Sequence, residues 1–286
     1  MTYKNTLNFQ TVEIQSRVVL TQKQQQLLRL YCPALVESAA PGKQIHIQIP
    51  ETPHITTLSI HRFNIQENWI EIIHPLDIPN KIKQLNAALD NTAGFKRPPQ
   101  GSTAIFIADD EGLSPLLCMI DHIHRESSIT PVLFLETETR FSFNPVPSRL
   151  FSLALPPEAI AAIPLLEDWG ILSRLAHYDG FPGCYEGSAA SLTEYYLEQT
   201  SPNKSNSVTI YASGALSLLT SAALLAQKFQ LTCQLHLLRH FHSTWTQKPP
   251  QSGMLKIRDL TIDFYNHGPV ISGNQLFVPP QGGNSN

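Results

Sequence analysis

Three consecutive acidic residues, Asp109, Asp110 and Glu111, follow a short apolar run from residue 104 to 108. The run is typical of a strand buried on both faces of a parallel sheet. The row of carboxylates either forms a solvated acidic turn or supplies oxygen ligands to a cation such as Mg²⁺. Two unit charges about 6 Å apart repel by roughly 3 kcal/mol at an effective dielectric constant near 20. We therefore expect this turn to disfavour a bound diphosphate.

A second group with possible chemistry lies near the end of the chain. Cys233, His236, His240 and His242 have the side-chain types that zinc accepts. If this segment is a strand, Cys233 and His236 point to opposite faces of the sheet. The sequence leaves two interpretations open, a metal site and a His-rich loop, and favours the loop.

A third group, His177, Asp179 and Ser188, has the residue types of a hydrolytic triad. The serine does not lie in a nucleophile elbow of the Gly-x-Ser-x-Gly type. The sequence therefore gives little support to hydrolysis.

The elements around the acidic turn form a β-α-β unit. Ser114 is suited to cap a helix and Pro115 to its first position. Apolar residues then recur at helical spacing and give the helix one apolar face: Leu116, Leu117, Ile120 and Ile123. Residues 129–135 read as the next strand. The turn between strand and helix is where such units bind phosphates.

Residues 1 to about 97 read instead as antiparallel β-structure. Short strands separated by turn residues are typical of a small barrel or sandwich; they are expected at 11–14, 17–20, 26–31, 44–49, 57–63 and 69–73. His46 alternates with Ile45 and Ile47, so we expect its side chain to face away from the core.

Length and composition narrow the class of protein. A chain of 286 residues suggests about two domains. The net charge of -3 and the lack of a basic run argue against nucleic acid or an anionic membrane as the main partner. No apolar run approaches about 18 residues, and the first residues lack an apolar signal core, so we expect a cytoplasmic protein. The cysteines are far apart, which favours reduced, buried thiols: Cys32, Cys118, Cys184 and Cys233.

The segment from Ala108 to Leu116 resembles the nucleotide-binding half of the ferredoxin–NAD(P) reductase superfamily. The superfamily pattern is Gly-Gly-Gly-x-Gly-x-x-Pro-Leu. Gly112 and Pro115 are kept, whereas Ala108, Asp109 and Asp110 replace the early glycines. Two further segments resemble the same domain: residues 176–188, with Asp179 and Gly180 in a Gly-rich loop, and residues 208–219, where Ser213 replaces a cysteine before Gly214. The resemblance implies dinucleotide contacts at Gly112, Ser114, Pro115, Asp179, Gly180 and Gly214.

The first half of the chain resembles the flavin-binding barrel of the same superfamily, and most of all the electron-transfer subunit of dihydroorotate dehydrogenase. That branch holds the flavin with an Arg-Pro-hydrophobic-Ser-Ile strand. Ser59 is kept and Thr56 stands in the arginine position. The branch then continues with a Gly-x-Gly-Thr turn for the diphosphate, but no glycine lies between Gly42 and Gly94 here. Gly94 and Phe95 resemble the element that joins the two domains, and the resemblance implies that they take part in cofactor binding.

The tail resembles the terminal [2Fe–2S] module of that branch. Such a cluster needs four thiolates, or two thiolates and two histidines. No cysteine follows Cys233, so we expect no [2Fe–2S] cluster.

The predicted fold is a flavin-type antiparallel β-barrel (residues 1–97), a parallel-sheet nucleotide-binding-type domain (98–230) and a cluster-less tail (231–286). Two functions remain. The favoured one is a binding or scaffold protein that has lost its cofactor sites and acts through a protein partner, such as a dehydrogenase catalytic subunit. The other is an FAD-dependent oxidoreductase subunit that passes electrons from NAD(P)H to a partner. NAD(P) is not expected to bind, FAD is the cofactor left open, and the sequence does not define the oligomeric state.

Overall fold

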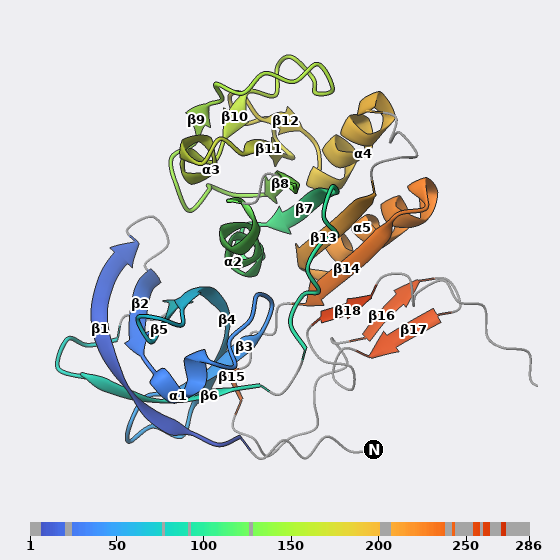
Figure 1. Ribbon diagram of the computed structural model, residues 1–286. Coiled ribbons are helices and arrows are strands. Elements are labelled where there is room, and N and C mark those ends of the chain that lie inside the picture. The colour runs from blue at the N-terminus through green and yellow to red at the C-terminus, as the bar shows by residue number, and fades with distance from the viewer. Residues whose placement is uncertain are drawn as a thin grey trace, which may run out of the picture.

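The protein was analysed as a computed structural model (Figure 1). It describes residues 7–20, 25–75, 78–90, 93–125, 128–200 and 207–237, together with the backbone of four short strands nearer the C-terminus. A β-barrel lies at the lower left of Figure 1, an α/β domain lies at the upper right, and helix α2 lies between them.

The N-terminal half is a closed antiparallel barrel, as the sequence predicts. Its strands run in the order β4-β3-β6-β1-β2-β5, and β5 pairs back onto β4 to close the barrel. Alternating side chains fill the interior: Leu28 and Leu30 of β2 are buried, as are Ile45 and Ile47 of β3. The elements are β1 (Gln10–Leu20), β2 (Gln25–Tyr31), α1 (Pro33–Val36), β3 (Gln44–Gln48), β4 (Ile55–Asn64), β5 (Trp69–His74) and β6 (Gln84–Leu89).

Two details of the barrel differ from the predicted strands. The predicted strands at 11–14 and 17–20 form a single strand, β1, with an irregularity in its register between Ile14 and Ser16. Strand β6 was not predicted, although Leu85 and Ala87 alternate into the core. His46 of β3 is half-buried, and its Nδ1 lies 3.0 Å from the Thr57 hydroxyl of the neighbouring strand.

The second domain is built on a mostly parallel sheet with the order β12-β11-β8-β7-β13-β14-β18. The chain steps from β7 outward to β12 on one side, then returns to place β13 and β14 on the other side. The elements are β7 (Thr103–Asp109), α2 (Leu113–Ile123), β8 (Thr130–Thr137), β9 (Val146–Pro147), β10 (Ala161–Ala162), α3 (Pro164–Asp168), β11 (Leu172–His177), β12 (Tyr185–Glu186), α4 (Ala189–Thr200), β13 (Val208–Gly214), α5 (Leu216–Phe229) and β14 (Thr232–Leu237).

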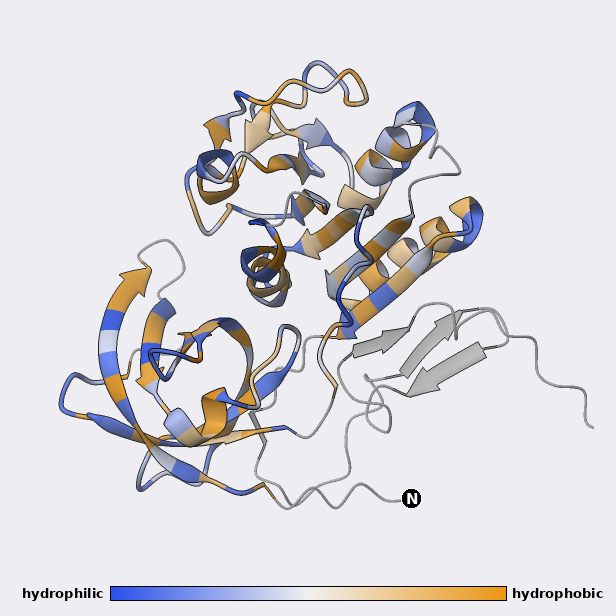
Figure 2. Ribbon diagram, in the orientation of Figure 1, coloured by the Kyte–Doolittle hydropathy of each residue, from blue (hydrophilic) through white to orange (hydrophobic). Residues whose placement is uncertain are grey.

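Helices cover both faces of this sheet, which explains why its central strands are mostly apolar (Figure 2). Ile105 and Ile107 of β7 pack in the core beneath α4 and α5. The alternate residues Ala104, Phe106 and Ala108 pack on the other face, with α2 and α3. The α/β prediction for this half of the chain is therefore confirmed.

The described strands of the tail join the two larger sheets. β15 (His242–Ser243) pairs with β4 of the barrel, and β18 (Val270–Ser272) pairs antiparallel with β14 of the α/β sheet. β16 (Met254–Ile257) and β17 (Leu260–Asp263) form a hairpin. His240 lies outside the described residues.

Candidate functional site at the carboxyl edge of the sheet

The site begins with Asp109, the last residue of β7. In open α/β sheets, ligands bind beyond the carboxyl ends of the strands, at the point where the strand order reverses. Here that point lies between β7 and β13. The Asp109 carboxylate spans it: Oδ1 accepts a hydrogen bond from the Gly112 amide at 2.7 Å, and Oδ2 accepts one from the Ala215 amide, also at 2.7 Å. One side chain thus binds the N-terminal ends of both α2 and α5.

Two glycines let the turns approach this carboxylate so closely. A Cβ atom on Gly112 would lie 1.9 Å from the Ser213 carbonyl oxygen, and one on Gly214 would lie 2.3 Å from Asp109 Oδ2. Gly214 also has φ of +150°, which L-residues rarely adopt. Structure thus brings Gly112 and Gly214 together around an internal carboxylate. Whether either glycine contacts a cofactor stays a prediction.

The interpretation of residues 109–111 as a solvated acidic turn is wrong for Asp109. Its side chain is half-buried and bonded to two amides. Burial raises the pKa of Asp109, and the two amide hydrogen bonds oppose that rise. Asp110 is also held, because its Oδ1 accepts a hydrogen bond from the Ser142 hydroxyl at 3.0 Å.

Ser114 does not cap α2, contrary to the prediction. The helix begins at Leu113 with Gly112 as its N-cap, and Pro115 is buried in its first turn. The Ser114 hydroxyl instead lies 2.9 Å from His61 Nδ1 on barrel strand β4. Burial lowers the pKa of His61 to about 4, so this imidazole is neutral near pH 7. The contact joins the barrel to the start of α2.

Glu136 is an important residue that the sequence analysis missed. It lies in β8, and its Oε2 accepts a hydrogen bond from the amide of Ala189, the first residue of α4, at 2.7 Å. Burial raises the pKa of Glu136, and the nearby Asp109 carboxylate adds to the rise. The signal available in the sequence was an acidic residue at the end of an otherwise apolar strand. Three helix N-termini on this edge are therefore bound by the chain's own carboxylates.

The Gly-rich loop after β11 lies at the same edge. Gly180 has φ of +71°, and Asp179 is exposed. The ring of His177 lies between the Thr139 carbonyl, 3.0 Å from Nε2, and the Asp179 amide, 3.2 Å from Nδ1. The Ser188 hydroxyl lies 3.0 Å from the Ser191 hydroxyl. His177 and Ser188 thus have other partners, which argues against the hydrolytic set.

The favoured His-rich loop is wrong for Cys233 and His236, because both lie in strand β14, where they point to opposite faces as strand geometry predicts. Cys233 packs in the core beneath α5, whereas His236 lies on the other face, with Nδ1 2.9 Å from the Ser213 hydroxyl. Burial raises the pKa of the Cys233 thiol. In the part of the chain that the structure describes, no group of three His, Cys, Asp or Glu side chains is arranged to hold a metal ion.

The barrel residues with predicted flavin contacts lie on β4. The Ser59 hydroxyl oxygen is buried and has no hydrogen-bond partner among the described residues. Thr56, at the position of the flavin arginine, is paired through its backbone with His242 of β15. The tail strand therefore lies along β4 where the resemblance places a flavin contact.

The loop after β5, where the resemblance places a diphosphate turn, is bound by the guanidinium group of Arg17. Arg17 of β1 donates hydrogen bonds from Nη1 to the carbonyls of Ile78 and Pro79, at 2.6 and 3.0 Å, and from Nη2 to the Ile82 carbonyl. The Ile78 amide donates to Gln26 Oε1 at 3.1 Å. A diphosphate site needs free amide donors, whereas the described part of this loop, residues 78–82, directs three carbonyls toward Arg17, and its Ile78 amide donates to Gln26.

Gly94 and Phe95 lie where the barrel meets the α/β domain. The Phe95 amide donates to the Pro41 carbonyl at 2.8 Å, and a Cβ atom on Gly94 would lie 2.3 Å from that oxygen. The Phe95 ring packs edge-on against Tyr211 of β13, with centroids 5.6 Å apart. These contacts explain the two residues through domain packing, and their predicted role in cofactor binding stays a prediction.

At the sheet edge, the Asp109 and Glu136 carboxylates accept the amides of Gly112, Ala215 and Ala189, which are donors of the kind that bind a diphosphate at a helix N-terminus. In the barrel, Ser59 keeps the side chain of the predicted flavin strand and Thr56 does not. None of the helices in the described parts of the chain has the length and apolar composition of a membrane span.

Comparison with known proteins agrees with the fold. No family model matches the sequence, and no curated protein matches it. Among solved structures, the chain is similar to an NADH-dependent reduced ferredoxin-NADP oxidoreductase, with a TM-score of 0.63 and 12% identity over 93% of this chain and 89% of that one. It is also similar to the ferredoxin reductase in carbazole 1,9a-dioxygenase, with a TM-score of 0.57 and 16% identity over 84% and 70% of the two chains.

A third similar structure is the FAD/NAD-binding domain of nitric oxide dioxygenase from Vibrio cholerae O1 biovar El Tor, with a TM-score of 0.52 and 12% identity over 80% of this chain and 98% of that domain. Identities this low establish the fold alone. The chain therefore has the two-domain fold of the ferredoxin–NAD(P) reductases.

Proposed function

We propose that this chain is a ferredoxin-reductase-like binding protein that does not use NAD(P)H and acts through a protein partner. The observation that carries the proposal is the Asp109 carboxylate, which accepts the amides of Gly112 and Ala215 at the reversal point of the sheet. An anionic diphosphate would have to displace this carboxylate and then lie beside it. Both steps oppose binding.

The barrel supports the same conclusion for the flavin. Thr56 cannot make the bidentate, charge-assisted contact of an arginine with phosphate. Loss of a hydrogen bond to a charged group costs about 1.5–3 kcal/mol, which is roughly 10- to 150-fold in affinity. The Arg17-bound loop at 78–82 offers no replacement for the missing glycine turn.

The resemblance to the electron-transfer subunit of dihydroorotate dehydrogenase suggests the kind of partner, namely a dehydrogenase catalytic subunit. In this proposal the chain keeps the shape of an electron-transfer subunit, so it is recognised by such a partner, but it carries no cofactor of its own.

A second function, a flavin-containing electron-transfer subunit, is favoured by one observation. The Ser59 hydroxyl is buried without a partner among the described residues, and a buried polar group of this kind usually has one. A flavin edge would supply it.

Flavin analysis separates the two functions. The purified protein is denatured, and the released small molecules are identified by mass spectrometry. We expect no stoichiometric FAD, and we expect Thr56→Arg to raise FAD affinity in a fluorescence-quenching titration relative to the natural chain. Tightly held, stoichiometric FAD in the natural chain would overturn the binding-protein proposal and favour the flavin subunit.

A further inference from the structure

The loop at residues 149–159 presents two large apolar side chains to solvent. Phe151 is 87% exposed and Leu153 is 86% exposed. The loop connects β9 to β10, and its ends are held together by a hydrogen bond from the Ser148 amide to the Ile160 carbonyl at 2.7 Å. Compact surface loops with close ends are frequently functional.

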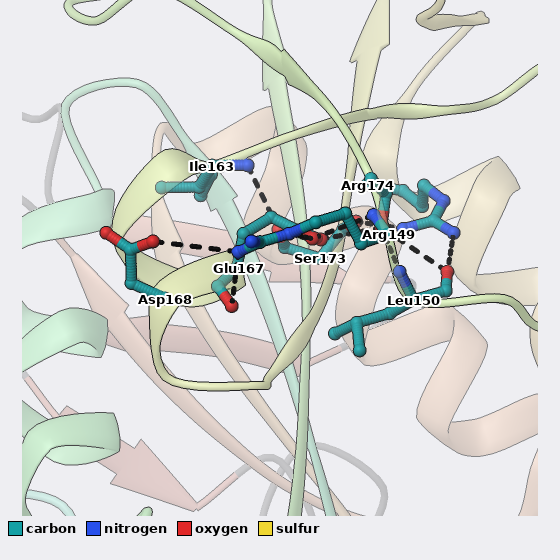
Figure 3. Close-up of polar contacts among 8 residues, drawn as sticks. Arg149, Leu150, Ile163, Glu167, Asp168, Ser173 and Arg174 are labelled. Atoms are coloured by element: carbon teal, nitrogen blue, oxygen red, sulfur yellow. Dashed lines mark hydrogen bonds and ion pairs between the residues drawn. The ribbon is translucent and has the colours of Figure 1, made fainter.

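A buried glutamate fixes the start of this loop (Figure 3). The side chain of Glu167, on α3, is only 2% exposed. Its Oε1 accepts a hydrogen bond from the Ser148 hydroxyl at 2.6 Å, and its Oε2 accepts one from the Arg149 amide at 2.9 Å. Burying a carboxylate is costly unless it is hydrogen-bonded, so these contacts hold the loop firmly.

A buried arginine, Arg174, fixes the backbone of the next loop residue, Leu150. Arg174 of β11 donates from Nη2 to the Leu150 carbonyl at 2.6 Å and from Nη1 to the Ser173 carbonyl at 2.7 Å (Figure 3). Beyond the exposed pair, Leu155 packs in the core with α4 and α5. Phe151 and Leu153 therefore lie between two anchored points and cannot easily fold back onto the protein.

The residues around Phe151 and Leu153 indicate what kind of surface would cover these two side chains. Ile160, 48% exposed, lies beside the Gly183 segment through a 2.9 Å backbone hydrogen bond, and Phe181 of that segment is 39% exposed. The exposed acidic residues on the loop and in the neighbouring segments are Glu158, Asp168, Asp179 and Glu186. The exposed basic residue of the loop is Arg149, and it pairs with Asp168 at 3.7 Å.

We propose that loop 149–159 is a docking element for a protein partner whose apolar cleft is bordered by lysine and arginine side chains. Phe151 and Leu153 enter the cleft, and the acidic surroundings face its basic border. Because the loop is already ordered, little conformational entropy is lost when it binds. The same acidic surroundings disfavour an anionic membrane and a second copy of this face. The inference rests on the proposed function in that the chain acts through a protein.

The test uses a photo-crosslinking amino acid at position 153 of the full chain in cells, with position 224 as the control. Leu224 is 42% exposed on α5 and so is a matched exposed leucine. The protein cross-linked at 153 and not at 224 is then purified, and its affinity is measured for three proteins: the natural chain, the Phe151→Ser/Leu153→Ser variant and the Leu224→Ser variant.

We expect the double variant to bind at least about 30-fold more weakly, as for the loss of an interface hot spot. We expect Leu224→Ser to change affinity less than about twofold, and the natural complex to weaken as salt rises. Equal binding by the double variant would overturn the docking loop while leaving the proposed function intact. Failure of any protein to bind would contradict both.

Two further measurements test whether a second copy of the chain or a membrane covers Phe151 and Leu153 instead. Sedimentation velocity of the purified chain reports a second copy, and co-sedimentation with phosphatidylserine vesicles reports a membrane. Self-association or vesicle binding that is lost in Phe151→Ser/Leu153→Ser would overturn the proposed partner class.

Discussion

Replacing Asp109 with alanine tests how strongly the internal carboxylate holds the sheet edge together. The change removes the acceptor for two amides at helix N-termini, those of Gly112 and Ala215. Loss of one N-terminal capping side chain costs about 0.5–2 kcal/mol. For two such contacts, one of them open to water, we expect a loss of about 2 kcal/mol in the free energy of unfolding. That corresponds to a melting temperature lower by about 4–8 °C.

The assay is urea and thermal unfolding followed by circular dichroism. The matched control is Asp179→Ala, which removes the same charge from the same edge at an exposed position. A surface substitution of this kind should change stability by less than about 0.5 kcal/mol. If Asp109→Ala is as stable as Asp179→Ala, the carboxylate does not hold the two turns and the reasoning is refuted.

The pH dependence adds a second criterion. Burial raises the pKa of Asp109 in the folded protein, so the folded carboxyl binds its proton more tightly than the unfolded one. Its contribution to stability is complete below the unfolded pKa and decreases as the pH rises through the folded pKa. The stability difference between the natural chain and Asp109→Ala should therefore shrink with rising pH over that window. A difference that grows with pH would contradict the raised pKa.

Three further predictions concern the contacts around the two sites. Arg17→Met should increase hydrogen exchange in loop 78–82, because the loop carbonyls lose their guanidinium partner; unchanged exchange would show that the loop is held in another way. Glu136→Ala should lower the free energy of unfolding by about 1–2 kcal/mol and increase amide exchange at the first turn of α4, because the helix loses its acceptor; equal protection in the variant would exclude this role. The His61 ring should remain neutral at pH 5.5 in an NMR titration, since its pKa is lowered to about 4, and stability should fall as the pH drops from about 6.5 toward 4; a midpoint near pH 6.5 would contradict its burial.

Local patterns predicted much of the fold. The β7–α2–β8 unit is encoded in short apolar runs and one apolar helix face, so its elements were found within a few residues of their observed bounds. The barrel was predicted from alternation within each strand. Strand β6 was missed because its sequence, Gln84 to Leu89, combines amide and alanine side chains that give a weak strand signal.

The site itself could be predicted only in part. Asp109 was found because it interrupts a regular pattern, but its partner Ala215 lies far away in the sequence. Glu136 was missed, and its partner Ala189 also lies far away in the sequence. Such pairs depend on which strands become neighbours. For the same reason, the sequence suggested that Ser114 caps its own helix, whereas the fold brings His61 of the barrel to its hydroxyl.

The pairing of β15 with β4 could not be predicted either. A two-residue strand, His242–Ser243, carries almost no local signal, and its partner, Thr56 of β4, lies far away in the sequence. The sequence shows that no cysteine follows Cys233, but it does not show the route of the tail.

We propose that the Asp109 carboxylate replaces a dinucleotide at the sheet edge. Isothermal titration calorimetry of the purified chain with NADH and with NADPH tests it most directly. We predict no saturable heat up to about 1 mM of either nucleotide, a limit that corresponds to a binding free energy weaker than about -4.1 kcal/mol. A dissociation constant in the micromolar range for either nucleotide would contradict the account.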